Sequence, residues 1–306
     1  MTVPDALRAL IGRSTSMEQV RSQIRCIAPA PIPVLIIGET GTGKELCAQA
    51  IARLSGRAPI VPVNCAALPD SLAESELFGH ERGAFTGAIR CNVGVIATAN
   101  GGILFLDELV DLSSPLQAKL LRALETGEYR PVGSTTTRRS DFRIIAATSG
   151  GLERIRPELL HRIGAVRVIL PPLRRRPEDI PLLATEFLRC YRERARRGPF
   201  RIARETYVML MQETWPGNVR QLRNVIEGAA ALAGTDNTLR VLQVSQVIAP
   251  DFRQETEPDC LSLVQIRRRS EQRAILNALE RVSGNRERAA RLLRISPATL
   301  YRKLQA

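Results

Sequence analysis

The chain has 306 residues, of which 44% are hydrophobic, enough for two or three domains with a sizeable core. Its 44 Lys and Arg against 31 Asp and Glu give a net charge of +13, which favours a polyanionic partner, nucleic acid before membrane. Six scattered cysteines without a CxxC pair and only two histidines argue against a disulfide framework and a His-based metal site. Neither a signal peptide nor an apolar run of transmembrane length occurs, so we expect a cytoplasmic protein with no membrane partner.

A glycine-rich segment near the N-terminus predicts a phosphate cradle. It lies between an apolar, strand-like run at 34–37 and a helix-compatible run at 46–52, which is the context in which GxxxxGK binds phosphate. Backbone N–H groups and the helix N-terminus would then face anionic oxygens, and the lysine would reach the terminal phosphates. The alternative is a glycine-rich loop that reverses the chain without binding phosphate, which fits the flanking strand and helix less well. The predicted cradle consists of Gly38, Glu39, Thr40, Gly41, Thr42, Gly43, Lys44 and Glu45.

Two adjacent acids end a second apolar strand, at 103–106. Downstream of a phosphate cradle, this is the Walker B arrangement. Asp107 would hold Mg²⁺ and Glu108 would polarise the attacking water, so the expected cofactors are ATP and Mg²⁺. Glu45 stands where a Ser or Thr hydroxyl usually contacts the metal. Asn64 ends a further short strand, at the edge where open α/β sheets bind their ligands.

A loop with glycines at both ends lies between the phosphate cradle and the Asp107–Glu108 pair. Regular helix or strand is disfavoured there, because glycine loses too much backbone entropy on ordering. A loop tip that carries Phe and Thr is a candidate contact with a partner; a Phe folded back into the core is the alternative. The loop residues are Gly83, Ala84, Phe85, Thr86, Gly87 and Ala88.

Further apolar strands at 141–149 and 166–170 alternate with helical segments, which predicts the α/β class with a parallel sheet and helices on both faces. The pattern becomes helical after 177. We therefore expect an α/β nucleotide-binding subdomain at 1–172, a helical lid at 173–235, a linker at 236–260 and an all-α domain at 261–306.

The last 46 residues carry eleven Lys and Arg against three Glu. A turn at 283–285 and a Ser-Pro break at 296–297 separate short helical runs, which is typical of a helix-turn-helix. Thr299, Arg302 and Lys303 would face double-stranded DNA. A small helical lid with solvated arginines is the alternative.

From about residue 10 to its end, the chain resembles the NtrC-type bacterial enhancer-binding proteins, the AAA+ activators of sigma-54 RNA polymerase. The phosphate loop with Glu45 after the lysine, GAFTGA at 83–88, WPGNVR at 215–220 and the C-terminal segment carry this resemblance. It implies that Phe85 and Thr86 engage sigma-54, and that the C-terminal segment is a Fis-like domain that binds DNA upstream of the promoter.

The resemblance also implies roles within the ATPase site. Asn64 would hold Glu108 in an inactive pose, and Arg220 would contact the nucleotide as sensor II. Arg156 and Arg162 would be offered to the neighbouring subunit of a hexameric ring, formed from this chain alone or with a related one. The implied partners are the sigma-54 RNA polymerase holoenzyme, upstream DNA and other copies of the chain.

Three departures from the family pattern stand out. Ser149 occupies the usual Asn position of sensor I, and the stretch from there to Arg156 is short. No receiver domain fits before residue 10, so we expect control by expression level or by a separate protein. Three alternatives stay open: a DNA-binding repressor that kept only the fold, an AAA+ remodeller of another class, and an activator that needs a partner subunit.

Overall fold

The computed structural model describes residues 6–248, with gaps at 197, 200 and 235, together with residues 290 and 295. It divides into two compact units, 1–250 and 251–306. Thr299, Arg302 and Lys303 lie outside the described residues, so their contact with DNA stays a prediction. Within the part that is described, no helix is both long and apolar enough to span a membrane.

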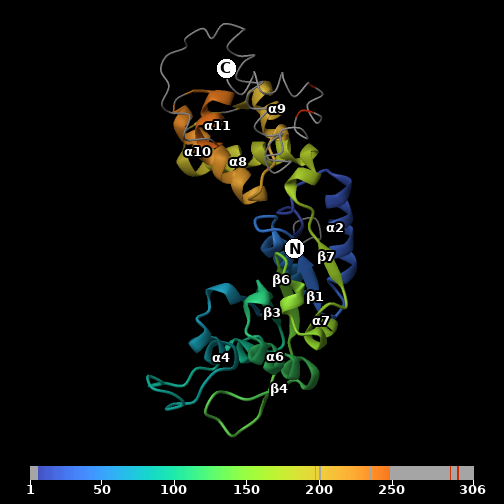
Figure 1. Cartoon of the computed structure of the whole chain (residues 1–306), viewed down its shortest axis with the longest axis vertical. Coiled ribbons are helices and arrows are strands. Elements are labelled where there is room, and N and C mark those ends of the chain that lie inside the picture. The colour runs from blue at the N-terminus through green and yellow to red at the C-terminus, as the bar shows by residue number, and fades with distance from the viewer. Residues whose placement is uncertain are drawn as a thin grey trace. The chain divides into compact units, whose positions relative to one another are not determined.

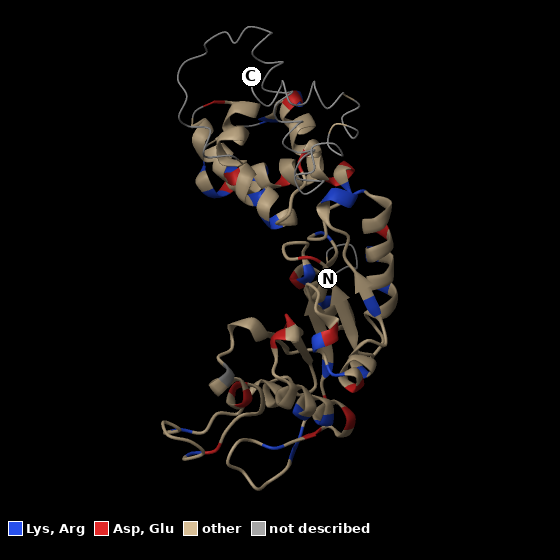
Figure 2. Cartoon of the chain, in the orientation of Figure 1, with Lys and Arg blue, Asp and Glu red and all other residues tan. Residues whose placement is uncertain are grey.

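A five-stranded parallel sheet with strand order β2-β3-β6-β1-β7 forms the centre of the first unit (Figure 1). The strands are β1 Val34–Ile37, β2 Ile60–Asn64, β3 Ile103–Asp107, β6 Arg143–Thr148 and β7 Arg167–Ile169. The sheet's inner strands are mostly apolar: β1 is Val-Leu-Ile-Ile, and β3 is apolar up to Asp107 at its end (Figure 2). Because all neighbouring strands are parallel, their carboxyl ends meet at one edge, where polar loops begin.

Helices cover both faces of this sheet, as predicted. Successive residues of β3 point to opposite faces: Phe105 packs with helices α2 and α3, whereas Leu104 packs with α4, α6 and α7. The helices are α2 Thr15–Ile27, α3 Lys44–Ser55, α4 Asp70–Phe78, α5 Val95–Thr98, α6 Ser114–Thr126 and α7 Pro157–Ile163. Short 3-10 turns are η1 Cys65–Ala67, η2 Leu109–Asp111, η3 Leu152–Arg154, η4 Leu173–Arg175 and η5 Pro177–Asp179.

A second, helical core follows η4 and surrounds Trp215, whose ring N–H donates to the Leu210 carbonyl at 2.7 Å. Its elements are α8 Ile180–Ala195, β8 Arg201–Ile202, α9 Arg204–Gln212, α10 Asn218–Ala233, β9 Thr238–Leu239 and α11 Val241–Ile248. The last two lie in the segment predicted as a linker. They instead pack on the lid, because Leu239 and Val244 find full burial there.

A buried arginine joins the sheet to helix α2. Arg143, at the start of β6, is 3% exposed and donates to three backbone carbonyls: Ile32 at 2.9 Å, Ala28 at 2.6 Å and Ile27 at 3.0 Å. These groups include carbonyls at the C-terminal end of α2, which a helix cannot satisfy by itself. Burial, and the neighbouring Arg57, lower the pKa of Arg143.

We expect Arg143→Met to lower the melting temperature by about 5–10 °C, because three buried acceptors lose their donor at a cost of roughly 2–3 kcal/mol. Thermal unfolding followed by far-ultraviolet circular dichroism measures this. Arg139→Met is the matched control, since Arg139 is exposed and its ion pair with Glu128 contributes at most about 1 kcal/mol. Equal melting temperatures for the two variants would contradict the structural role of Arg143.

Candidate active site

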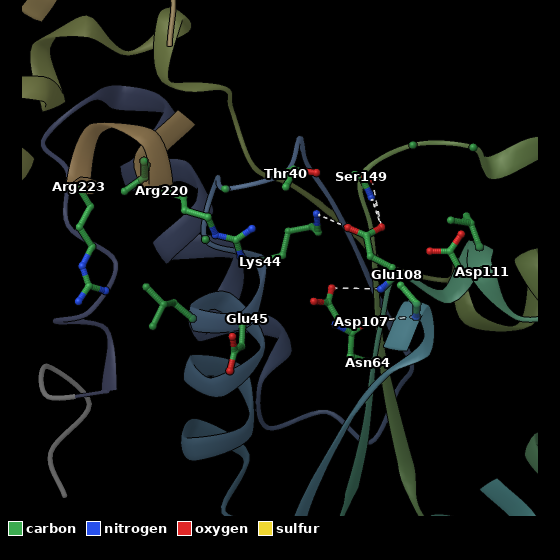
Figure 3. Close-up of a pocket in the computed structure, with 18 of the residues that line it drawn as sticks. Thr40, Lys44, Glu45, Asn64, Asp107, Glu108, Asp111, Ser149, Arg220 and Arg223 are labelled. Carbon is green, nitrogen blue, oxygen red and sulfur yellow. Dashed lines mark hydrogen bonds and ion pairs between the residues drawn. The ribbon is translucent and has the colours of Figure 1, made fainter. Parts of the chain in front are cut away.

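A cleft of about 800 Å³ lies at the carboxyl edge of the sheet and is closed on one side by helix α10 (Figure 3). Three residues of the predicted phosphate cradle, Gly38, Glu39 and Thr42, do not line this cleft. Among the predicted site residues, those that line the cleft are Thr40, Gly41, Gly43, Lys44, Glu45, Asn64, Asp107, Glu108 and Arg220.

The phosphate loop connects β1 to α3 and has the backbone that its glycines permit. Gly41 and Gly43 have φ angles of 80° and 106°, in the left-handed region that disfavours residues with a Cβ. No side chain caps the start of α3, so its first N–H groups can bind an anion. The nearly buried Lys44 ammonium donates to the Gly38 carbonyl and to Glu108 Oε1, both at 3.0 Å.

Glu108 is held by two residues, Lys44 at the start of α3 and Ser149 just after β6. Besides Lys44, its carboxylate accepts hydrogen bonds from the backbone N–H of Ser149 at 2.9 Å and from the Ser149 hydroxyl at 3.1 Å. Burial alone would raise the pKa of Glu108, but the donors Ser149 and Lys44 outweigh it and lower that pKa. Glu108 is therefore an ionised carboxylate at neutral pH, and its left-handed backbone, with φ at 49°, marks a constrained position.

Asp107 lies beside Glu108 and accepts the Glu108 backbone N–H at 3.1 Å. Its pKa is raised, first by burial and then by the negative charge of Glu108. A bound cation would relieve both effects. Magnesium is commonly held by one or two protein carboxylates plus phosphate oxygens, so Asp107 next to the phosphate loop fits such a site. Asp107 would hold the ion, and Glu108 could orient a water molecule.

Asn64 lies opposite Asp107 in the β2–β3 register. Its side-chain oxygen accepts the backbone N–H of Ala66 at 3.1 Å and so caps η1. Ser149, singled out in the sequence as a departure, makes the contacts to Glu108 instead. The role of Asn64 as the residue that restrains Glu108 stays a prediction.

The lid is bonded directly to the phosphate loop. Asn218, fully buried with φ at 52°, donates to the Thr40 carbonyl at 3.1 Å and to Glu39 at 3.2 Å, and accepts the Leu173 N–H at 2.8 Å. Arg174 binds both oxygens of Glu39 at 2.7 and 2.5 Å, and this pairing lowers the pKa of Glu39 to about 2.

Backbone contacts complete this junction. The Arg220 N–H donates to the Gly41 carbonyl at 3.2 Å, and a Cβ on Gly41 would lie 2.3 Å from the Gly217 carbonyl oxygen. Arg174 and Asn218 were not singled out as functional by the sequence patterns. The turn signal at 216–218 was the available clue, since Asn tolerates left-handed backbone better than most residues.

Neither predicted arginine finger lines the cleft of its own chain. Arg156 precedes α7, and its backbone N–H donates to the Gln117 side chain at 2.8 Å. Arg162 is exposed near the end of α7 and donates to the Leu124 carbonyl at 2.9 Å. The structure thus separates these two arginines from Lys44, and their action on a neighbouring subunit stays a prediction.

The loop at 83–88 projects from the body of the unit between α4 and α5 (Figure 1, cyan). It is closed by a hydrogen bond from the Gly83 N–H to the Ala88 carbonyl at 2.9 Å, and Gly83 and Gly87 have φ angles of 80° and 104°. Phe85 is 39% exposed, with its ring edge-on to His80 at a centroid distance of 5.1 Å. Phe85 therefore stays at the surface instead of entering the core.

A second loop, at 130–137, supports the first. It connects β4 Glu128–Tyr129 with β5 Arg138–Arg139. Val132 exchanges backbone hydrogen bonds with Gly79 and Glu81 at 2.9 and 3.0 Å, and Gly133 packs closely on Ala84. The sequence patterns did not identify this loop as a support, because its contacts join residues about 50 apart in the chain.

We expect Asn218→Ala to lower the free energy of unfolding by about 2–3 kcal/mol, because a buried N–H loses its acceptor and Ala disfavours left-handed backbone. Urea unfolding followed by the fluorescence of Trp215, the chain's one tryptophan, reports on this part of the lid. Gln212→Ala, an exposed helix position in the same lid, should change the value by less than about 0.5 kcal/mol. Coincident unfolding curves for the two variants would show that the junction is not stabilising.

Three family models match the chain. The model described as "Sigma-54 interaction domain" matches residues 10–168, "AAA+ ATPase lid domain" matches 174–259, and "Bacterial regulatory protein, Fis family" matches 266–306. Together they match the three kinds of segment that the motifs predicted.

Known proteins agree with this assignment. The transcriptional regulatory protein ZraR of Salmonella typhimurium is 43% identical over 304 residues, which cover 96% of this chain and 68% of that protein. NtrX from Brucella abortus in complex with ADP has a TM-score of 0.74 at 35% identity and covers 99% of this chain and 70% of NtrX. NtrX in complex with ATP has the same TM-score and identity, with 96% and 68% covered.

The family predicted from the motifs is confirmed by the model matches and by the relatives that share them. Because the sigma-54 interaction model spans more than half of the 306 residues, the chain belongs to the sigma-54 interaction family, the NtrC-type AAA+ ATPases that act as sigma-54-dependent transcriptional activators with a Fis-type helix-turn-helix.

Proposed function

We propose that the chain binds DNA upstream of a promoter, assembles into a ring, and uses ATP hydrolysis to remodel the closed complex of sigma-54 RNA polymerase through its 83–88 loop. The observation that carries this proposal is that the phosphate loop, Asp107 and Glu108 line the same cleft. These groups are the minimum that phosphoryl transfer to water requires: a phosphate cradle, a magnesium ligand and a residue that orients the nucleophile.

The Lys44–Glu108 ion pair suggests how ATP changes the site. Phosphates entering the loop compete with Glu108 for the Lys44 ammonium, because they carry more charge and are better acceptors. Glu108 Oε2 then keeps its Ser149 contacts, while Oε1, released from Lys44, becomes free to orient water. Magnesium bound at Asp107 would supply charge neutralisation on the transferred phosphoryl group. Asn64, the register partner of Asp107, would restrain Glu108 in another nucleotide state.

Assembly would complete the site. Arg156 and Arg162 lie outside their own cleft, as expected of residues that act on a neighbouring subunit. An arginine supplied in this way typically accelerates hydrolysis by about 10³–10⁵. We infer a hexameric ring, composed of this chain or of this chain with a related subunit. Arg220, whose backbone is bonded to the phosphate loop, would sense the nucleotide from the lid.

Two segments that line the cleft, those of Asn64 and Glu108, continue along the chain into the two neighbouring loops. Asn64 leads through η1 and α4 to the loop at 83–88, and Glu108 leads through η2 and α6 to the loop at 130–137. The two loops are bonded to each other at their bases. Movement of Asn64 or Glu108 would therefore be transmitted to Phe85 and Thr86, the residues that we infer to contact sigma-54. The Fis-type segment would keep the ring near the promoter by raising its local concentration.

We expect ATPase activity per subunit to rise steeply with protein concentration and to fall by at least 10²-fold in Arg162→Ala, because the neighbour then lacks a charge-stabilising arginine. Phosphate release measured across a concentration series checks this. Arg139→Ala, an equally exposed arginine, should behave like the wild type. Activity that is independent of concentration and unaffected by Arg162→Ala would rule out the trans arginine.

We expect Thr86→Ala to keep ATPase activity within about twofold, because Thr86 lies outside the cleft, and to abolish activation of a sigma-54 promoter. Phosphate release and transcription in a reconstituted assay, measured on the same preparation, separate the two effects. Thr15→Ala, at the exposed start of α2 and away from the cleft and both loops, should leave both unchanged. Normal activation by Thr86→Ala would refute the proposed role of the loop.

A further inference from the structure

A third arginine on the same segment as the two predicted fingers lines the cleft of its own chain. Arg154 ends η3, and its half-exposed side chain lies in the wall that also contains Glu108 and Ser149. None of the family motifs in the sequence includes it. Its position follows from the short connection after β6, in which Gly151, with φ at 67°, turns the chain back towards the cleft.

The charges around the cleft are unevenly distributed. Among the described residues that line it, Lys44 comes from the phosphate loop, and Arg220 and Arg223 come from the lid helix α10. The opposite wall carries three acids, which Figure 3 shows on the side away from α10: Asp107, Glu108 and Asp111. Within that lining set, Arg154 is the one cation supplied by this acidic wall, whose other charged side chains are all carboxylates.

The ion pair between Arg154 and Asp111 is weak enough for another anion to replace Asp111. One guanidinium nitrogen lies 3.3 Å from Asp111 Oδ1, with side chains that are 59% and 34% exposed. Solvent-accessible ion pairs of this kind contribute about 0–1 kcal/mol. The terminal phosphate of ATP is a stronger acceptor for a guanidinium than a single carboxylate oxygen at 3.3 Å, because it carries more charge and can accept two N–H groups. Arg154 can therefore leave Asp111 at little cost.

The backbone of Arg154, by contrast, is fixed by one buried side chain. Gln117 is 1% exposed; its amide N–H groups donate to the carbonyls of Arg154 at 3.2 Å and Leu112 at 2.9 Å, and its oxygen accepts the Arg156 N–H. Gln117 bonds only to backbone groups, so within the part of the chain that the structure describes, the Arg154 guanidinium is held by its exposed ion pair with Asp111 alone. An anchored backbone with an exchangeable ion pair suits a residue that binds an entering anion.

We propose that Arg154 is a cis arginine of this ATPase site: it leaves Asp111 and contacts the terminal phosphate of ATP bound to its own subunit. The inference rests on the proposed ATPase function and extends it to a residue outside the family motifs. Arg154 would stabilise the same developing charge as the neighbour's arginines, but from within the subunit that binds the nucleotide.

Mixing experiments with the full chain test this assignment. Lys44→Ala chains cannot hold phosphate in their own site but still carry Arg156 and Arg162 for a neighbour. We expect Arg154→Ala to lower kcat by about 10²-fold with a smaller change in KM, and to gain nothing from an excess of Lys44→Ala. Arg162→Ala, mixed in the same way, should regain activity, because its own site is intact and its neighbour supplies the arginine.

Asp111→Asn separates a ligand role from a structural one. If Arg154 served only to hold Asp111, this variant would reproduce the loss seen in Arg154→Ala; we expect its kcat to fall far less than that of Arg154→Ala. Arg154→Lys, which keeps the charge, should recover part of the activity, and it provides the same comparison if Arg154→Ala folds poorly.

Wild-type kcat and KM for Arg154→Ala, or its rescue by Lys44→Ala, would overturn the cis assignment. Failure of Arg162→Ala to be rescued would instead count against the ring. The comparison of Arg154→Ala with Asp111→Asn would still decide on Arg154, so the two failures are distinguishable.

Discussion

The ion pair between Lys44 and Glu108 is the interaction on which the rest of the site depends. Its two side chains are 7% and 19% exposed and meet at 3.0 Å, so each would pay a large desolvation cost without the other. Three adjacent strands deliver this contact: β1 leads into Lys44, β3 into Glu108, and β6 between them into Ser149. A parallel sheet with this strand order places the three groups together, because all its strands end at one edge.

The same pair connects the phosphate loop to the lid and to the loop at 130–137. Lys44 belongs to a loop that Glu39 and Gly41 tie to the lid, whereas Glu108 begins the wall that continues through α6 to the loop at 130–137. An anion that draws Lys44 away from Glu108 acts on both connections at once. Proteins transmit such local changes through elements with alternative arrangements of contacts, and a shared ion pair at their junction is one such element.

Much of the fold and part of the site were predictable from local patterns. Apolar runs that alternate with helical stripes predicted the parallel α/β sheet, and the phosphate loop and the Asp107–Glu108 pair could be placed on it, since both motifs depend on residues that are adjacent in the chain. Predictions about segment 236–260 were less accurate. Leu239 and Val244 belong to short apolar stretches without a clear period, and only the packing of α10 and α9 shows where they are buried.

The sequence by itself determined the family, the phosphate-loop and Asp-Glu motifs and the glycine-bounded loop, because each of these is encoded in a contiguous run of residues with a strong local preference. The tertiary structure decided which partners those residues have. It placed Ser149 rather than Asn64 on Glu108, joined Asn218 and Arg174 to the phosphate loop, and turned Arg154 into the cleft while Arg156 stays outside. The contacts of Ser149 with Glu108 and of Asn218 with Glu39 join residues 41 and 179 positions apart. They depend on the strand order and on buried hydrogen bonds that no local pattern encodes.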